Sequence, residues 1–194
     1  EGTYRIALVG YTNAGKSTLM NVLTGAKVLV QDQLFATLDT TTRKLNIDVG
    51  MPVLVSDTVG FIRNLPHDLI ASFRSTLSEI RDVDMLVKVF DATSENTLQN
   101  IDTVGEVLKE IDMPSKTSII VFNKIDVISE PDVLSGLKTR FGDASFISSL
   151  NSTGIDMLTS KIQDTITSQF CHDVFQLSFK QIKVLNTIYT LTRV

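Results

Sequence analysis

The segment Gly10-Tyr11-Thr12-Asn13-Ala14-Gly15-Lys16-Ser17 decides the fold of this chain. It matches the pattern G-x-x-x-x-G-K-[ST], which wraps backbone N–H groups around a phosphate when it lies between a strand and a helix. The flanking sequence provides this context: Tyr4 to Val9 is an apolar run typical of a buried strand, and a helical pattern extends from about Lys16 to Leu23, closed by Gly25. The segment therefore predicts a phosphate-binding loop.

Each residue type in this loop has a physical reason to be there. The glycines let the backbone wrap tightly, and the positive end of the following helix faces the anion. Lys16 brings a mobile positive charge to the outer phosphates, and the Ser17 hydroxyl is a ligand for Mg2+. The residues expected to contact the nucleotide here are Asn13, Ala14, Gly15, Lys16, Ser17 and Thr18.

Outward from the loop, short apolar runs alternate with amphipathic stretches. Gly50-Met51-Pro52 is a turn signal, so the strands on either side of it are expected to form an antiparallel hairpin. Alternation of strands and helices predicts an α/β domain whose mostly parallel sheet has one antiparallel strand and helices on both faces. Further strands are predicted at 44–49, 53–56, 85–90, 118–122 and 145–147, and further helices near 69–80, 98–111, 130–141 and 155–166.

Asn123-Lys124-Ile125-Asp126 follows the apolar run 118–122 and indicates which base is bound. Asp126 can accept two hydrogen bonds from the ring N–H and amino group of guanine. Adenine lacks this donor pair and would leave the carboxylate desolvated without a partner. Lys124 can lay its aliphatic stem over the base, and Asn123 can brace the phosphate loop and contact the base. Together with the phosphate loop, this segment predicts a P-loop GTPase (Ras-like) domain that binds GTP and GDP.

Two further segments follow predicted strands. Asp57-Thr58-Val59-Gly60 comes after the strand 53–56. Asp57 is expected to hold Mg2+, through a water molecule, and the Gly60 N–H to contact the terminal phosphate. Ser148-Ser149-Leu150 follows the last strand, and its backbone N–H groups are expected to face the guanine carbonyl.

The polar, threonine-rich stretch from Gln31 to Arg43 is the expected sensor of the terminal phosphate. A GTPase needs one threonine there to bind Mg2+ and the γ-phosphate, and to release them on hydrolysis. The residue pattern alone leaves four candidates open: Thr37, Thr40, Thr41 and Thr42.

Composition excludes some partners. The 194 residues are 43% hydrophobic and 21% charged, as in an ordinary soluble globular protein. A net charge of -4 argues against binding to DNA, or to nucleic acid generally, through bulk electrostatics. No apolar run is long enough to cross a membrane. The single cysteine, Cys171, cannot form an intrachain disulfide, which fits a reducing compartment.

The pattern of the chain changes after about Gln169. We expect a GTPase domain over residues 1–169, followed at 170–194 by the beginning of a truncated C-terminal appendage. The chain starts at Glu1 and enters a strand almost at once, which indicates a fragment of a longer protein.

Longer phrases of the sequence resemble the HflX family of translational GTPases. They are GYTNAGKSTL from Gly10, DQLFATLD from Asp32 followed by TTR, and DTVGFIRNLPHDL from Asp57. The resemblance covers roughly residues 4–169. It places the first switch around Thr37, which implies that Thr37 is the threonine that binds Mg2+. Thr40 departs from the family, which usually has proline there; this change loosens the switch but removes no ligand.

The resemblance implies a cytoplasmic protein that binds the large ribosomal subunit and splits stalled ribosomes, notably under stress. The family carries an N-terminal domain and a helical segment before the GTPase domain, which this sequence lacks. The residues from Cys171 resemble the start of the family's C-terminal region. Because the N-terminal part is implicated in ribosome engagement, we expect this fragment to bind nucleotide without that activity.

Lys16, Thr37 and Gly60 are the residues expected to act on the terminal phosphate, but one usual side chain is missing. Ras-like GTPases have a glutamine after the D-x-x-G element to orient the attacking water, and this chain has Phe61. Slow intrinsic hydrolysis is therefore predicted, with the site completed by a partner such as the ribosome or by a monovalent cation. Asn13 matches the asparagine that holds K+ in potassium-dependent GTPases, although a backbone N–H contact and a local turn bond are the more common role for such a residue.

Three alternative functions remain open. One is a GTPase in ribosome assembly or tRNA modification, where related phosphate loops occur. Another is a non-hydrolysing nucleotide-binding module. The third, an ATP-dependent kinase or transporter ATPase, is opposed by Asp126.

Overall fold

A computed structural model describes residues 2–26, 41–58, 81–110, 116–170 and 184 of the chain. Within these residues, six strands form one sheet in the order β2-β3-β1-β4-β5-β6. The strands are β1 (Tyr4–Gly10), β2 (Thr41–Leu45), β3 (Val53–Asp57), β4 (Met85–Asp91), β5 (Thr117–Asn123) and β6 (Ser145–Phe146). The helices are α1 (Lys16–Thr24), α3 (Thr97–Glu110), α4 (Pro131–Arg140) and α5 (Ile155–Thr167), with a 3-10 turn at Ile125–Val127.

The sheet is parallel except at one edge. β1 lies in the middle and pairs in parallel with β3 and β4, so that Ile6 faces Val55 on one side and Met85 on the other. β2 is antiparallel to β3, with Leu45 opposite Val53. The predicted α/β architecture with one antiparallel strand is therefore confirmed.

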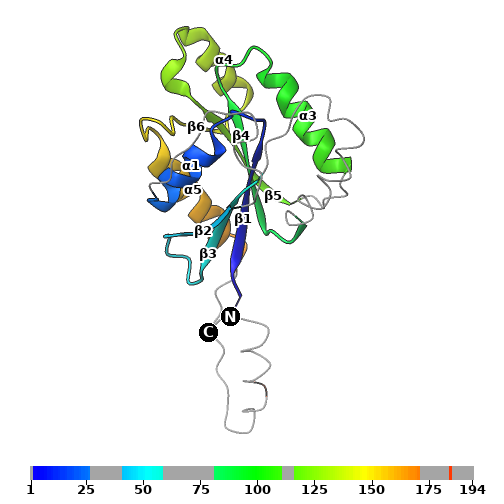
Figure 1. The fold of residues 1–194 in the computed structure, drawn as a ribbon, viewed down its shortest axis with the longest axis vertical. Coiled ribbons are helices and arrows are strands. Elements are labelled where there is room, and N and C mark those ends of the chain that lie inside the picture. Colours follow the sequence, from blue (N-terminus) through cyan, green and yellow to red (C-terminus); the bar gives the residue numbers. More distant parts are fainter. Residues whose placement is uncertain (1, 27–40, 59–80, 111–115, 171–183, 185–194) are drawn as a thin grey trace.

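Two apolar cores cover the two faces of the sheet. On one face, Ile6 and Leu8 of β1 pack with Leu158 and Ile162 of α5 and with Leu19 of α1. On the other face, alternate residues of the same strands pack against α3 and α4. This second core contains Ala7, Val9, Leu86, Phe90, Val104, Leu108 and Phe122. Figure 1 shows α1 and α5 on one side of the sheet and α3 on the other. Because successive side chains of β1 point to opposite faces of the sheet, this strand contributes residues to both cores.

The predicted hairpin exists, but its first strand was placed too late in the sequence. The prediction of 44–49 followed the apolar residues Ile47 and Val49, whereas β2 covers Thr41–Leu45. The chain turns directly after Leu45, where the Ile47 N–H donates to the Leu45 carbonyl. Ile47 and Val49 instead pack against the core from outside the strand.

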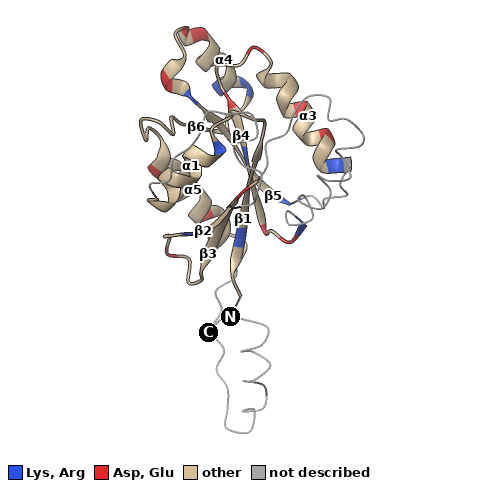
Figure 2. Cartoon of the chain, viewed as in Figure 1, with Lys and Arg blue, Asp and Glu red and all other residues tan. Residues whose placement is uncertain are grey.

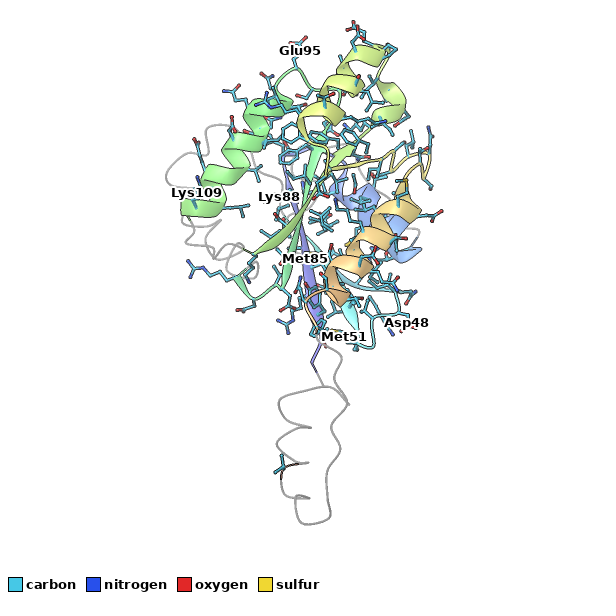
Figure 3. The ribbon with its side chains drawn as sticks, turned by 180° about the vertical axis from the view of Figure 1, so that it is seen from behind. Asp48, Met51, Met85, Lys88, Glu95 and Lys109 are labelled. Carbon is cyan, nitrogen blue, oxygen red and sulfur yellow. The ribbon has the colours of Figure 1, made fainter. Side chains whose placement is uncertain are left out.

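The connection between β2 and β3 is fastened to the last helix. Figure 3 shows Asp48 and Met51 in this connection, beside the C-terminal part of α5. The Gln163 Nε2 donates a 2.9 Å hydrogen bond to the Asp48 carbonyl. The antiparallel edge of the sheet is thus held against α5 by a polar contact as well as by the core.

The start of the first strand meets the end of the last helix. The Tyr4 hydroxyl donates to Gln169 Oε1 at 2.9 Å, and the Tyr4 ring packs edge-on against Phe170 at 6.4 Å between centroids. The expected boundary between a domain over 1–169 and an appendage over 170–194 falls here, but nearly all of 170–194 lies outside the described residues.

Charged residues of both signs are mixed over the surface. Figure 2 shows residues of both signs on α3, α4 and α5, with acidic residues toward the start and basic residues toward the end of α4. None of the helices in the described ranges combines the length and the apolar character that a bilayer crossing requires.

Candidate functional site

The predicted phosphate loop joins β1 to α1, and its backbone needs glycine at both ends. Gly10 has a φ of 155°, and a Cβ there would lie 2.1 Å from the carbonyl oxygen of Val89 in the neighbouring strand. Gly15 has a φ of 87°, and a Cβ there would lie 2.3 Å from Asn123 Nδ2. Side chains are therefore excluded at both positions by space as well as by backbone conformation. Asn13, at the exposed tip, adopts a left-handed φ of 60°.

Lys16 begins α1 and points back into the loop. Its Nζ donates to the carbonyl oxygens of Gly10 at 3.2 Å and Tyr11 at 2.9 Å, and the residue is only 6% exposed. Burial lowers the pKa of Lys16 from 10.5 to about 8, although the carboxylate of Asp57 acts in the opposite direction. The ammonium group is thus held where the loop closes, partly desolvated and available to an anion.

Ser17 and Asp57 form the expected pair of oxygen ligands. The Ser17 Oγ donates to Asp57 Oδ2 at 2.5 Å, across 40 residues of sequence. Asp57 ends β3 and is 1% exposed. A hydroxyl beside a buried carboxylate, next to a phosphate loop, is the donor set that Mg2+ takes when it also binds phosphate oxygens. The described residues contain no cluster of three or more His, Cys, Asp or Glu suited to a metal. The fit to Mg2+ therefore depends on the nucleotide for its remaining ligands.

Asn123, the last residue of β5, links the two predicted nucleotide segments. Its Nδ2 donates to the carbonyl oxygen of Ala14 at 2.9 Å, so the expected brace on the phosphate loop is present. Its Oδ1 accepts hydrogen bonds from the Ser149 N–H at 2.9 Å and the Ser149 hydroxyl at 3.0 Å. With 2% exposure, Asn123 uses both ends of its amide to tie three loops together.

Lys124 and Asp126 extend from this anchor. Lys124 has a left-handed φ of 67°, and its Nζ forms a 2.7 Å ion pair with Asp91 Oδ2. Asp126 lies in the 3-10 turn and is exposed to solvent, as a carboxylate that receives a ligand must be.

The loop after β6 is folded tightly beside them. The Ser148 N–H donates to the Thr153 carbonyl, and the Ser148 hydroxyl accepts from the Asn151 N–H at 3.1 Å. Gly154 then closes the loop with a φ of 73°. Leu150, the last residue of the predicted segment, is 78% exposed.

Thr37, Thr40, Gly60 and Phe61 lie outside the described residues. The other two threonine candidates, Thr41 and Thr42, belong to β2, and the Thr42 hydroxyl is 2.7 Å from the Ser56 hydroxyl of the paired strand.

Asp91 is absent from the residues predicted for the site, and Thr58 was named in the segment after β3 without a role. Asp91 ends β4 and receives the Lys124 ion pair. The same reasoning that selected polar residues after the other strands could have found it. Thr58 follows Asp57, is 4% exposed, and donates through Oγ1 to the Leu8 carbonyl at 2.7 Å. Its hydroxyl thereby fixes the end of β3 to β1, a purely tertiary contact that has no sequence signature.

All these groups lie at the carboxyl edge of the parallel strands, on both sides of the switch in strand order at β1. The phosphate loop, the Ser17–Asp57 pair and the Asn123 anchor together define a P-loop domain of the GTPase class. A family model described as 50S ribosome-binding GTPase matches residues 5–124. The chain therefore belongs to this family.

Individual relatives confirm the resemblance to HflX. The chain is 41% identical over 98% of its length to GTPase HflX of Gluconacetobacter diazotrophicus, and spans 42% of that protein. It is 40% identical over 96% of its length to GTPase HflX of Escherichia coli, and spans 44% of that protein. The chain thus covers less than half the length of these curated relatives.

A solved structure shares the fold. The GTP-binding protein from the archaeon Sulfolobus solfataricus, in complex with GDP, superposes with a TM-score of 0.65 at 28% identity. The match covers 86% of this chain and 53% of that one. Binding of a guanine nucleotide by this chain is supported by this similarity together with the family membership.

Proposed function

We propose that this chain is the Mg2+-dependent, GTP-binding and slowly GTP-hydrolysing domain of an HflX-like GTPase. The observation that carries the proposal is the double hydrogen bonding of Asn123, to Ala14 in the phosphate loop and to Ser149 beside the base site. A single buried amide thereby sets the spacing between the phosphate end and the base end of one ligand. Preorganisation of this kind favours a ligand of matching length, such as a nucleoside di- or triphosphate.

The phosphates occupy the loop from Asn13 to Thr18, where backbone N–H groups, the helix terminus and Lys16 supply positive potential. The Ser17 hydroxyl and the Asp57 carboxylate, with Oγ and Oδ2 2.5 Å apart, would hold Mg2+, and the ion would neutralise phosphate charge. By resemblance to the family, Thr37 would also bind the ion and Gly60 would contact the terminal phosphate.

The base lies between Lys124 and the loop Ser148 to Leu150. Asp126 accepts the two guanine donors, and the exposure of this side chain leaves it available to them. An Asp126→Asn variant tests this role. It should lose GTP affinity and gain affinity for xanthosine nucleotides, because xanthine presents an acceptor where guanine presents a donor. Unchanged preference for GTP would contradict the assignment.

Hydrolysis is slow in isolation because Phe61 stands where a water-orienting glutamine is usual. The large ribosomal subunit, or K+ held at Asn13, completes the site. Cytoplasmic action on the large subunit, including the splitting of stalled ribosomes, is the function proposed for the whole protein from its HflX-like sequence.

The decisive experiment measures phosphate release by the full-length protein with and without large ribosomal subunits, in potassium and in sodium buffer. We expect stimulation by the subunits. Equal rates in the two buffers would remove the role of Asn13. Absence of release under every condition would identify a nucleotide-binding module that does not hydrolyse GTP.

A further inference from the structure

We propose that Asp91 is a positioning residue for guanine-nucleotide binding, which holds the Lys124 ammonium so that the stem of this lysine is already placed for the base. This inference rests on the proposed role of Lys124 in the base site. Asp91 lies outside the phosphate loop and the Asn123 to Asp126 segment, and it ends a different strand, β4.

The orientation of the Asp91 carboxylate is fixed by contacts other than the one with Lys124. Its Oδ1 accepts two hydrogen bonds from Thr93, from the backbone N–H at 2.9 Å and from Oγ1 at 2.6 Å. The other oxygen, Oδ2, is left facing Lys124 Nζ at 2.7 Å. The two carboxylate oxygens thus have separate tasks: one fixes the group and the other receives the lysine.

The backbone around the pair is equally constrained. Asp91 is the register partner of Asn123 across β4 and β5, and the Ala92 N–H donates to the Asn123 carbonyl at 2.9 Å. The Asp91 carbonyl accepts a 2.6 Å hydrogen bond from Thr97 Oγ1 at the start of α3. Figure 3 shows Glu95, in the short connection between these points, at the end of the molecule toward which the parallel strands run. The ion pair therefore lies directly beside the anchor of the base site.

Lys124 needs such a partner. A left-handed φ of 67° is unfavourable for a residue with a Cβ, and a lysine side chain has many rotamers to lose when it covers a ligand. Asp91 compensates for both costs, because it holds the end of the Lys124 side chain in place before a nucleotide binds. Burial raises the pKa of Asp91, but the hydrogen bonds from Lys124 and Thr93 outweigh it, so that the pKa lies below its usual value and the carboxylate stays charged near neutral pH.

A second ion pair of the same length provides a control. Lys161 Nζ and Asp143 Oδ1 are also 2.7 Å apart, and both lysines are 28% exposed. The carboxylates differ, because the side chain of Asp143 is fully exposed whereas that of Asp91 is 21% exposed. Exposed pairs contribute little, so Asp143→Asn is a matched substitution with no expected effect on binding.

The test measures binding and dissociation of fluorescent GDP, together with competition by GTP and inosine diphosphate, for Asp91→Asn. We expect the Kd of all three nucleotides to rise about five- to twenty-fold, mostly through faster dissociation, because a preordered contact common to them is lost. Asp143→Asn should stay within about two-fold of the original protein. Thr93→Ala, which keeps the charge but removes one fixing bond, should show a smaller loss.

A double-mutant cycle with Lys124→Ala separates positioning from general structure. If Asp91 acts through Lys124, Asp91→Asn should change the Kd less than two-fold in the Lys124→Ala background. An equal loss in both backgrounds would overturn the proposal, as would original affinity in both Asp91→Asn and Thr93→Ala. If Asp91→Asn does not fold, original affinity in Thr93→Ala alone would overturn it. Unchanged binding in Lys124→Ala would instead refute the proposed base contact itself, so the two failures are distinguishable.

Discussion

The Nδ2 of Asn123 lies 2.9 Å from the carbonyl oxygen of Ala14, although 109 residues separate them in sequence. Gly15 follows Ala14, and the approach of Asn123 is so close that a Cβ at Gly15 would meet Nδ2 at 2.3 Å. The phosphate loop and the base-binding loop are therefore one assembly built around a buried amide. Substitutions that disturb this amide should affect stability and nucleotide binding together.

Asn123→Ala should lower the free energy of unfolding by about 2–3 kcal/mol, because it leaves the Ala14 carbonyl and the donors of Ser149 buried without their partner. Urea unfolding of the nucleotide-free protein measures this directly. Thr139→Ala removes only an exposed hydroxyl on α4 and should change stability by less than about 0.5 kcal/mol. Similar losses for the two variants would contradict the central role of Asn123.

Two glycine substitutions should change the free energy of unfolding in opposite directions. Gly10→Ala should cost about 3 kcal/mol or more, since its Cβ would meet the backbone of Val89 at 2.1 Å and its φ of 155° disfavours a side chain. Gly105→Ala, within α3, would bring no atom of the described residues within 4 Å of the new Cβ and should stabilise the protein by about 0.5–1 kcal/mol. Thermal unfolding of both variants checks the pair, and destabilisation by Gly105→Ala would mean that another group packs against this position of α3.

The stability of the nucleotide-free protein should rise with pH above 8. The folded pKa of Lys16, about 8, lies below its ordinary value of 10.5, so the unfolded chain binds more protons between these two pH values. The free energy of unfolding should therefore increase across this window, by at most about 1.4 kcal/mol per pH unit. Urea titrations from pH 7 to 10 should show this slope reduced in Lys16→Met. Parallel profiles for the two proteins would assign the slope to other groups.

Asp57→Asn should weaken Mg2+ binding in the presence of GDP by about ten-fold or more, because it removes the buried carboxylate next to Ser17. Affinity for GDP should then respond less to EDTA than it does in the original protein. Asp84→Asn is a control at the opposite end of the sheet, where Asp84 accepts a hydrogen bond from the Arg5 N–H. A full response to EDTA in Asp57→Asn would exclude Asp57 from the metal site.

Phe122 should be one of the most sensitive core positions. It is fully buried and packs against the rings of Phe90, Phe141 and Phe146 at centroid distances of 5.1–6.2 Å. Phe122→Ala should lower the free energy of unfolding by about 3–5 kcal/mol. Phe122→Leu, which leaves a smaller cavity, should cost less. If urea unfolding gave the same loss of stability for Phe122→Ala and Phe122→Leu, the surrounding rings would have moved to fill the cavity left by the alanine.

Much of this fold follows from local sequence, because the loop from Gly10 to Ser17 and the alternating apolar runs carry their own structural signals. The strands around 85–90 and 118–122 were predicted almost to the residue, since each is mostly apolar and largely buried, although Lys88 interrupts β4 and Ser118 is exposed at the start of β5. The edge strand β2 was misplaced because it is mostly polar, Thr41 to Lys44, and only its pairing with β3 makes it a strand. The local β-propensity of these residues does not reflect their pairing with β3, which comes later in the sequence.

In the site, too, residues in a local motif were predicted, and residues whose role depends on tertiary contacts were not. Asn123, Lys124 and Asp126 were recognisable as a motif, and the brace on Ala14 was anticipated from it. Asp91 was missed although it follows a predicted strand, because a lone aspartate there belongs to no motif. Its ion pair with Lys124 depends on the neighbouring strand, which places the lysine beside it. The depressed pKa of Lys16 was equally invisible, since it depends on how deeply the loop buries the ammonium.

The contact of Tyr4 with Gln169 and Phe170 has a consequence for engineering the chain. The first strand and the last helix meet across 165 residues of sequence, at the pole opposite the nucleotide edge. New covalent connections can therefore be made at this pole without crossing the site. A circular permutant that joins Phe170 to Tyr4 by a short linker would close the chain at this pole and leave the nucleotide edge unchanged. A reporter attached directly before Tyr4, or directly after Phe170 in a shortened chain, would lie away from the nucleotide site.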